Sequence, residues 1–141
     1  MNIKDQLRRN TVALISLVIA ITSLGYNTWR NEASESNRTH RLVALEVLIR
    51  LGELQQLTWH HHFDKDIDDK GNLRTGWTLV LVIRDICKIL DEPLPDSTTN
   101  LYATWEKYSD HLDTSRTAND AIIAAISDVR QDTLQLLQML D

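Results

Sequence analysis

The feature that most restricts this chain is an uncharged run of twenty residues near its N-terminus, Asn10 to Trp29. As an α-helix, a run of this length spans about 30 Å, which matches the hydrocarbon core of a bilayer. Two arginines precede the run, and Tyr26, Trp29 and Arg30 close it. Cationic and aromatic side chains at both ends are typical of the interfacial anchors of a membrane-spanning helix. We therefore expect a single N-terminal transmembrane helix.

Two other interpretations stay open because the densely apolar part, Val12 to Leu24, has only thirteen residues. A cleaved signal peptide also has a basic start and a short apolar centre, and Ser23 and Gly25 are small enough for its cut site. A buried helix of a soluble protein is the third interpretation. The anchor is favoured because a polar stretch without Gly or Pro follows the run, so nothing in the sequence breaks the helix there.

Positive charge sets the expected orientation. Lys4, Arg8 and Arg9 closely precede the apolar run, whereas the basic residues that follow it are more widely spread. Because cytoplasmic flanks are enriched in Lys and Arg, we expect the N-terminus in the cytoplasm. The expected location is the inner (plasma) membrane, with one span and with the C-terminal domain in the periplasm or outside the cell.

Small residues recur on one face of the expected span, spaced three, four and three apart: Ala13, Ser16, Ala20 and Ser23. Such a face lets two membrane helices approach closely, and its hydroxyls are available for bonds across the contact. Ala and Ser are also common in membrane helices for other reasons. The stripe therefore indicates contact with a protein partner or a second copy of the chain, and composition alone explains it equally well.

Composition restricts the rest of the chain to one small helical domain. Its 141 residues suit a single core, and four glycines and two prolines are too few for an all-β architecture. Four basic side chains against one acidic occur up to residue 30, and 11 against 19 thereafter. The resulting net charge of −8 after residue 30 would repel phosphate backbones, so we expect no nucleic-acid partner.

Hydrophobic spacing predicts four amphipathic helices after residue 30. The first continues from the span through a polar neck and carries apolar residues from Leu42 to about His62. Its expected core face consists of Leu45, Leu48, Gly52, Gln55 and Trp59, widened by Leu42, Ile49 and Leu51. The second is predicted from Thr75 to Leu90, although residues 78–83 also fit a buried strand.

A break containing Pro93 and Pro95 separates the second helix from the third, which Asp96 or Ser97 is expected to cap. The fourth helix is predicted from about Thr117 to Leu140. Short connections between consecutive helices favour an antiparallel arrangement. The expected fold is therefore all-α, with a single N-terminal transmembrane helix continuing into an antiparallel four-helix bundle. Residues 1–30 would form the membrane anchor and residues 31–141 the helical-bundle domain.

One cluster of side chains invites a metal ion. His60 and Asp64 lie four residues apart, so both reach the same side of a helix, and His111 is the obvious third ligand. Adjacent helical residues point about 100° apart, so His61 and His62 cannot join His60 on one ion. A solvated helix end without a metal is the simpler interpretation of the cluster.

The acidic loop from Asp64 to Thr75 matches a calcium-binding EF-hand only in part. Carboxylates occupy its first, third and fifth positions. The sixth position, normally Gly, is Asp69, and the twelfth, normally Glu, is Thr75. The loop therefore indicates at most a weak and unspecific cation site.

The remaining candidates have ordinary structural explanations. Four aromatic residues fit a ligand pocket or, more commonly, a bundle core: Trp59, Trp77, Trp105 and Tyr108. Arg84 lies in the most apolar predicted helix, so it either faces an edge or pairs with a carboxylate such as Asp128 or Asp132. Cys87, the single cysteine, is expected to be buried and unreactive.

Motifs that mark catalysis are missing from the sequence, among them G-x-S-x-G, C-x-x-C, the phosphate-binding loop, G-x-G-x-x-G and H-E-x-x-H. We therefore expect neither an enzyme nor a bound cofactor. The expected function is that of a non-catalytic, membrane-tethered interaction or accessory protein.

The predicted architecture, one membrane helix feeding a helical bundle, resembles the ligand-sensing domains of bacterial membrane receptors. The resemblance implies an alternative function, an extracytoplasmic bundle that senses a small ligand or a metal ion. Such receptors usually return through the membrane to a signalling domain, whereas this sequence ends at Asp141. We therefore expect it not to signal alone.

Overall fold

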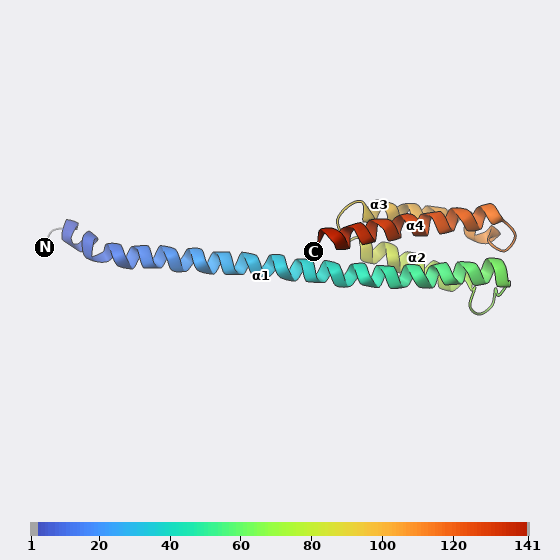
Figure 1. The fold of residues 1–141 in the computed structure, drawn as a ribbon, viewed down its shortest axis with the longest axis horizontal. Helices are drawn as coiled ribbons and strands as arrows, with labels where there is room; N and C mark the ends of the chain where they lie inside the picture. Colours follow the sequence, from blue (N-terminus) through green and yellow to red (C-terminus); the bar gives the residue numbers. More distant parts are fainter. Residues whose placement is uncertain (1–2, 141) are drawn as a thin grey trace. The chain divides into compact units, whose positions relative to one another are not determined.

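Helices make up all the regular structure in the computed structural model, which describes residues 3–140 and the side chains of residues 6 and 10–140. The elements in order are α1 (Ile3–Trp59), the π-helical turn η1 (His60–Asp64), α2 (Leu73–Cys87), α3 (Leu94–Tyr108), the 3₁₀ turn η2 (Ser109–His111) and α4 (Arg116–Met139). No strand occurs among these described residues (Figure 1). The prediction of an all-α fold is confirmed, and the strand alternative for residues 78–83 is wrong.

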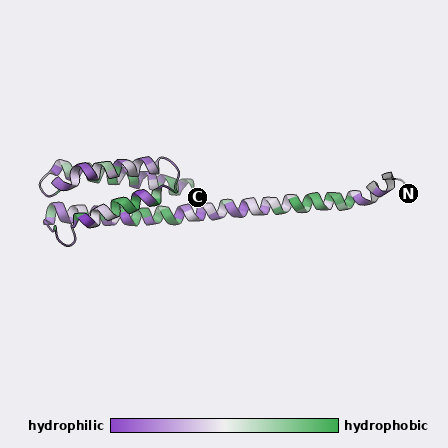
Figure 2. Cartoon of the chain, turned by 180° about the vertical axis from the view of Figure 1, so that it is seen from behind, coloured by the Kyte–Doolittle hydropathy of each residue, from purple (hydrophilic) through white to green (hydrophobic). Residues whose placement is uncertain are grey.

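The chain forms two compact units, Met1–Arg38 and Thr39–Asp141, and α1 contributes to both. In the first unit an apolar stretch of α1 is followed by a polar one (Figure 2). Ser16, Thr22 and Thr28 each donate a hydrogen bond to the carbonyl four residues earlier, at 2.8–2.9 Å. These hydroxyls are therefore satisfied within the helix that carries them.

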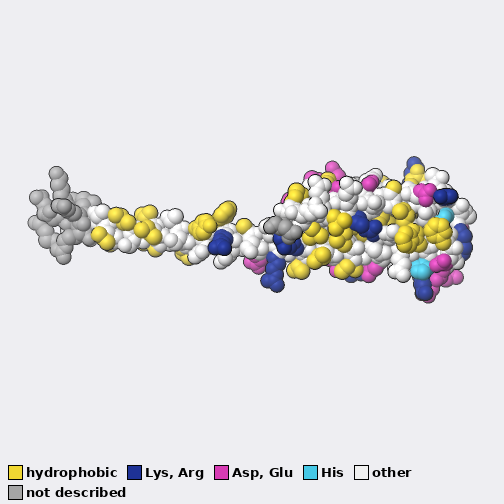
Figure 3. Space-filling model, viewed as in Figure 1, with side chains coloured by type: hydrophobic (Ala, Val, Ile, Leu, Met, Phe, Trp, Pro, Cys, Tyr) yellow, Lys and Arg dark blue, Asp and Glu magenta, His cyan; other side chains and the backbone are white. Residues whose placement is uncertain are grey.

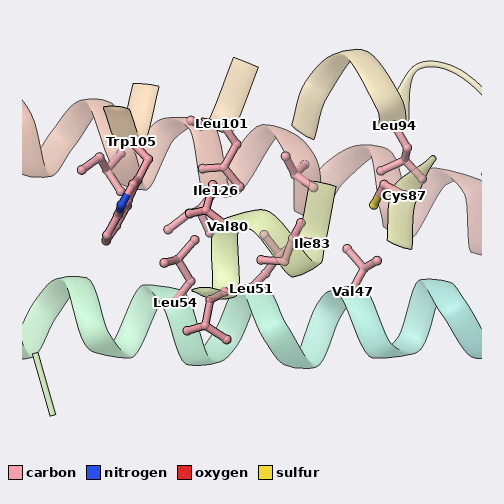
Figure 4. Packing of buried hydrophobic residues seen from close by; sticks show 14 of the residues in the cluster. Val47, Leu51, Leu54, Val80, Ile83, Cys87, Leu94, Leu101, Trp105 and Ile126 are labelled. Carbon is pink, nitrogen blue, oxygen red and sulfur yellow. The ribbon is translucent and has the colours of Figure 1, made fainter. Parts of the chain in front are cut away.

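The second unit, called the domain from here on, is a helical bundle with one apolar core. All four helices contribute side chains that are fully or almost fully buried, namely Val47, Leu51, Leu54, Val80, Ile83, Leu101, Trp105, Ile122 and Ile126. Figure 4 shows α1 presenting Val47, Leu51 and Leu54 toward the residues of the other helices. This interdigitated burial supplies the main driving force for folding.

The core face of α1 differs from the predicted one. Val47, Leu51 and Leu54 are buried, whereas Leu45 and Trp59 are exposed. Of the residues assigned to that face, only Leu51 is buried. The prediction failed because this part of α1 carries aliphatic residues at helical spacing on two sides, and periodicity alone does not say which side meets the bundle.

Helix α2 is fixed at its start by Asn72, whose side chain accepts a 2.9 Å hydrogen bond from the backbone of Arg74. An asparagine at this position satisfies one of the backbone donors that a helix start leaves open. Further along, Gly76 lies against the indole of Trp105 so closely that a Cβ would overlap the ring. The close approach of α2 to α3 therefore depends on glycine at this position.

Helix α3 begins at Leu94, earlier than the predicted start, and Pro95 lies in its first turn. The prediction treated the prolines as a break, but a proline in the first turn loses no hydrogen bond because its missing N–H has no helical acceptor there. Helix α4 begins one residue before its predicted start. The Ser115 side chain caps it by accepting a bond from the backbone of Ala118.

Candidate functional site

The predicted metal cluster lies at the end of α1, where the chain turns through η1. His60 Nδ1 and Asp64 Oδ2 are 2.6 Å apart, as their spacing predicts. His111 lies in η2 and is exposed. Within the described part of the chain, no three His, Cys, Asp or Glu side chains gather closely enough to hold a metal ion. The structure therefore joins two of the three candidate ligands and shows no third beside them.

The three consecutive histidines each bind a different neighbour. His61 is buried, and its Nδ1 lies 2.7 Å from the carbonyl of Gly71. His62 Nδ1 lies 2.6 Å from the carbonyl of Leu112. The run therefore ties the end of α1 to the following loop and to the segment between α3 and α4. Their divergent directions follow from the sequence, whereas their partners depend on how the chain folds back.

The acidic loop after η1 is organised by hydrogen bonds within itself. The Asp66 carboxylate accepts bonds from the backbone N–H groups of Asp69 and Lys70, at 3.2 and 3.4 Å. Lys65, in the left-handed conformation at φ 57°, donates to the carbonyl of Asp113. Gly71 lies against backbone atoms of His61 and Asp66, where a Cβ would clash. These contacts give the loop a structural role.

The four aromatic candidates do not line a common pocket. Trp105 is fully buried in the core, whereas Trp59 is exposed. Trp77 meets Tyr102 edge to face, with ring centroids 5.7 Å apart. Other residues line three grooves of the described domain, and none of the four aromatic candidates is among them. Trp105 therefore packs as ordinary core, and Trp77 at its edge.

Arg84 was expected either to face an edge or to pair with a carboxylate such as Asp128 or Asp132, and Asp132 is not its partner. The Arg84 guanidinium stacks over Tyr102 at 4.4 Å from the ring centroid, and its Nε lies 3.8 Å from the carboxylate of Asp85. Asp132 instead accepts a hydrogen bond from Ser97. A planar guanidinium is well suited to an aromatic face, which explains why a tyrosine on α3 holds Arg84 in place of a carboxylate on α4.

Cys87 is fully buried and free, as predicted. Burial raises the pKa of its thiol from 9.0 to about 12, because the thiolate would be poorly solvated in the core. The thiolate is the reactive form of cysteine, so this residue is chemically silent near neutral pH.

A groove of about 560 Å³ lies between α1 and α2. Leu57 and Leu79 form the apolar part of its lining, and the rest of the lining is polar or charged: Arg50, Glu53, Gln56, His60, Lys70, Thr75 and Thr78. Arg50 is held by Glu46 at 2.7 Å and by Glu53 at 3.0 Å. These two hydrogen-bonded carboxylates raise the pKa of Arg50. The groove combines an apolar part with charged side chains, and it was not anticipated from the sequence.

The predicted span presents its apolar side chains to its surroundings. One window of eighteen residues in α1 reaches a mean hydropathy of 1.6, and none of that window is buried. The four small residues predicted to share a face are likewise exposed: Ala13, Ser16, Ala20 and Ser23. By length and composition, this is the single helix among the described residues that is long and apolar enough to cross a membrane.

No protein-family model, no curated protein and no solved structure matches the chain.

Proposed function

We propose that this chain is a non-catalytic, single-pass membrane protein whose antiparallel four-helix bundle serves as an interaction module at the membrane surface. The observation that carries the proposal is the apolar stretch of α1, where every large aliphatic side chain from Val12 to Leu24 is more than half exposed. Water penalises a continuous apolar surface of this kind, whereas a bilayer accommodates it. This favours a membrane span over the buried helix of a soluble protein.

A retained anchor is favoured over a cleaved signal peptide by the continuity of α1. The helix runs through the candidate cut site at Ser23 and Gly25 and reaches Trp59. Signal peptidase cleavage needs an accessible segment with small residues, and an unbroken helix offers a poor one. The mass of the protein recovered from membranes tests this point, because a retained anchor gives the full 16.2 kDa chain. A product that begins near residue 26 would contradict the anchor.

The proposed orientation puts the N-terminus in the cytoplasm and the domain in the periplasm or outside the cell. It is supported by the dense positive charge of the sequence before the span. Protease added to spheroplasts should digest the domain while the cytoplasmic face remains sealed. Protection of the domain until the membrane is broken would contradict this orientation.

The interaction role is supported by the small-residue face of the span. The Ser16 hydroxyl donates to the carbonyl of Val12, so it needs no partner from a helix packed against this face. Replacing Ala20 with Leu should weaken helix–helix contact, because the added side chain keeps two backbones apart. Chemical crosslinking in native membranes measures the effect, with Ile19→Leu as a control that keeps bulk similar. Equal crosslinking yield in Ala20→Leu and the unmodified chain would remove this contact from the proposal.

A second candidate function, sensing of a small ligand or metal ion, is favoured by the groove between α1 and α2, because His60 forms part of its wall. In this case Zn²⁺ should raise the thermal midpoint of the protein, and the combined changes His60→Ala and Asp64→Ala should abolish the shift. His111→Ala serves as the matched control. Absence of a shift with any divalent cation would exclude the metal version.

A further inference from the structure

The domain leaves a line of apolar side chains exposed on the side of α1 that faces away from its core. Leu42, Leu45, Ile49 and Trp59 are 61%, 50%, 57% and 46% exposed. We call the set formed by Leu42, Leu45, Ile49, Gly52, Gln56 and Trp59 the outer stripe. Hydrophobic side chains are visible at the surface along α1 in the domain (Figure 3). A stripe of this length on a folded domain indicates a contact surface.

The spacing of the outer stripe is that of a coiled-coil seam. Its members follow one another at intervals of three, four, three, four and three residues, which places Leu42, Ile49 and Gln56 at a positions and the others at d positions. The buried side chains Val47 and Leu51 occupy f and c positions of the same heptads, on the opposite side of the helix. The outer stripe is thus a second seam, independent of the bundle core.

The packing of the domain does not explain why glycine occupies position 52 of the seam. It lies inside α1, and a Cβ at this position would meet no atom within 4 Å. Glycine weakens a helix relative to alanine, and nothing in the packing of the domain requires it here. A position without a side chain does let the backbone of a second helix come close. The open space at Gly52 therefore leaves room for the backbone of a second helix.

Polar residues along the seam favour a parallel, in-register partner with the same sequence. Gln56 at an a position meets its own counterpart when two copies align, and a single polar a residue specifies register in this way. Glu46 and Glu53 flank the seam at e positions. In an antiparallel pair e positions face e positions, which would oppose these glutamates to one another. In a parallel pair Glu46, which Arg50 holds within its own helix, faces the basic residue Arg41 of the other copy at a g position, so no acidic residues are opposed there.

Arg41 already donates a hydrogen bond to the carbonyl of Leu140. Glu53 faces Leu48 in the parallel alignment, and no like charges meet along the seam. The charge pattern therefore selects a second copy in parallel orientation over an antiparallel one.

We propose that the partner of the outer stripe is a second copy of this chain, which docks through it as a short parallel two-helix coiled coil. The inference rests on the proposed membrane anchor, because two copies inserted in one membrane share their orientation and are concentrated in a thin layer. A seam of this length is marginal between free helices in water. Tethering to a common membrane supplies the local concentration that such a seam needs.

Disulfide trapping in membranes isolated from expressing cells tests the proposal with the full chain. Gly52→Cys places a thiol on the seam, and the open space around Gly52 means that the fold accommodates it. Ser127→Cys places a thiol on an exposed position of α4, away from the seam. Cys87 remains in every variant because it is buried. A copper–phenanthroline oxidant is added, the membranes are washed at alkaline pH, and the covalent dimer is measured in pellet and supernatant.

The expected result is a covalent homodimer of Gly52→Cys in the pellet, about tenfold more abundant than that of Ser127→Cys, since disulfides form only when the two Cβ atoms lie within about 4.5 Å. Adding Ile49→Glu to Gly52→Cys should abolish the dimer, because two buried glutamates would face each other. Adding Ile89→Glu, at an equally exposed isoleucine outside the seam, should leave it intact.

Three outcomes would overturn the proposal. If the pelleted Gly52→Cys protein remains monomeric, or if Ser127→Cys dimerises equally, a second copy does not dock on the outer stripe. Either result leaves the proposed membrane anchor unaffected. If the pelleted protein is joined at residue 52 to a different polypeptide, the partner of the outer stripe is that polypeptide and not a second copy. Protein found in the supernatant instead contradicts the proposed anchor itself, so the two failures are distinguishable.

Discussion

At the scale of single residues, two glycines of the domain should respond oppositely to the same change. Gly52→Ala should raise the free energy of unfolding by about 0.5–1 kcal/mol, because it removes the entropic cost of glycine from a helix and meets open space. Gly76→Ala should lower it by about 1–3 kcal/mol, because its methyl group overlaps the indole of Trp105. Chemical denaturation of both variants in the same detergent measures the difference. Equal effects of the two changes would contradict the packing of α2 against α3.

Cys87 gives the second prediction at this scale. Burial raises the pKa of its thiol from 9.0 to about 12, so between these pH values the unfolded chain loses a proton that the folded chain keeps. Stability contributed by Cys87 should therefore be present below pH 9 and decline as pH rises, by about 1.4 kcal/mol per pH unit within that window.

Comparison with Cys87→Ala isolates this loss, because both chains share every other titrating group. A thiol reagent at pH 8 should modify Cys87 only after denaturant is added. Rapid modification of the native protein would show that the thiol is accessible and would contradict its burial.

At the scale of the helical elements, the start of α2 depends on one side chain. Asn72→Ala should destabilise the domain by about 1 kcal/mol, because the backbone N–H of Arg74 loses its acceptor. Asn100→Ala is the matched control, since Asn100 is exposed within α3 and alanine is the better helix former there. Thermal unfolding followed by circular dichroism should show a lower midpoint for Asn72→Ala alone. Similar midpoints for the two variants would contradict the capping role.

Helix type and approximate extent were predictable from the sequence because hydrophobic spacing and capping residues act locally. Ser115 and the turn around Gly71 mark their boundaries by short-range chemistry. The core face of α1 was not predictable in the same way. Leu45 and Leu51 are chemically alike, and only the placement of the other helices decides that Leu51 is buried while Leu45 is exposed.

The candidate sites show the same division between local and long-range information. The His60–Asp64 contact follows from a spacing of four residues and was predicted. The bond of His62 to the carbonyl of Leu112 joins residues fifty positions apart, so no local pattern announces it. The outer stripe was visible in the sequence as a run of apolar residues, but it became a candidate contact surface only once the core was found on the opposite side of α1.

At the scale of the whole molecule, one chain combines an exposed apolar segment with a domain that buries its own apolar core. The domain buries residues from all four helices, whereas the apolar window of α1 has none of its residues buried. A soluble monomer would carry that window at a continuing cost in water. The proposed membrane anchor would remove this cost and would keep the domain, with its outer stripe, close to other copies in the same bilayer.

The proposed anchor is tested most directly by washing membranes that contain the full chain at alkaline pH and measuring how much protein stays in the pellet. The chain should stay there, and the paired changes Ile15→Lys and Ile19→Lys should release it, since each lysine at the centre of a span costs about 3 kcal/mol. Ile89→Lys, at a similarly exposed isoleucine of the domain, should leave the protein in the pellet. Release of the unmodified chain, or equal release of all three proteins, would contradict a span through residues 10–29.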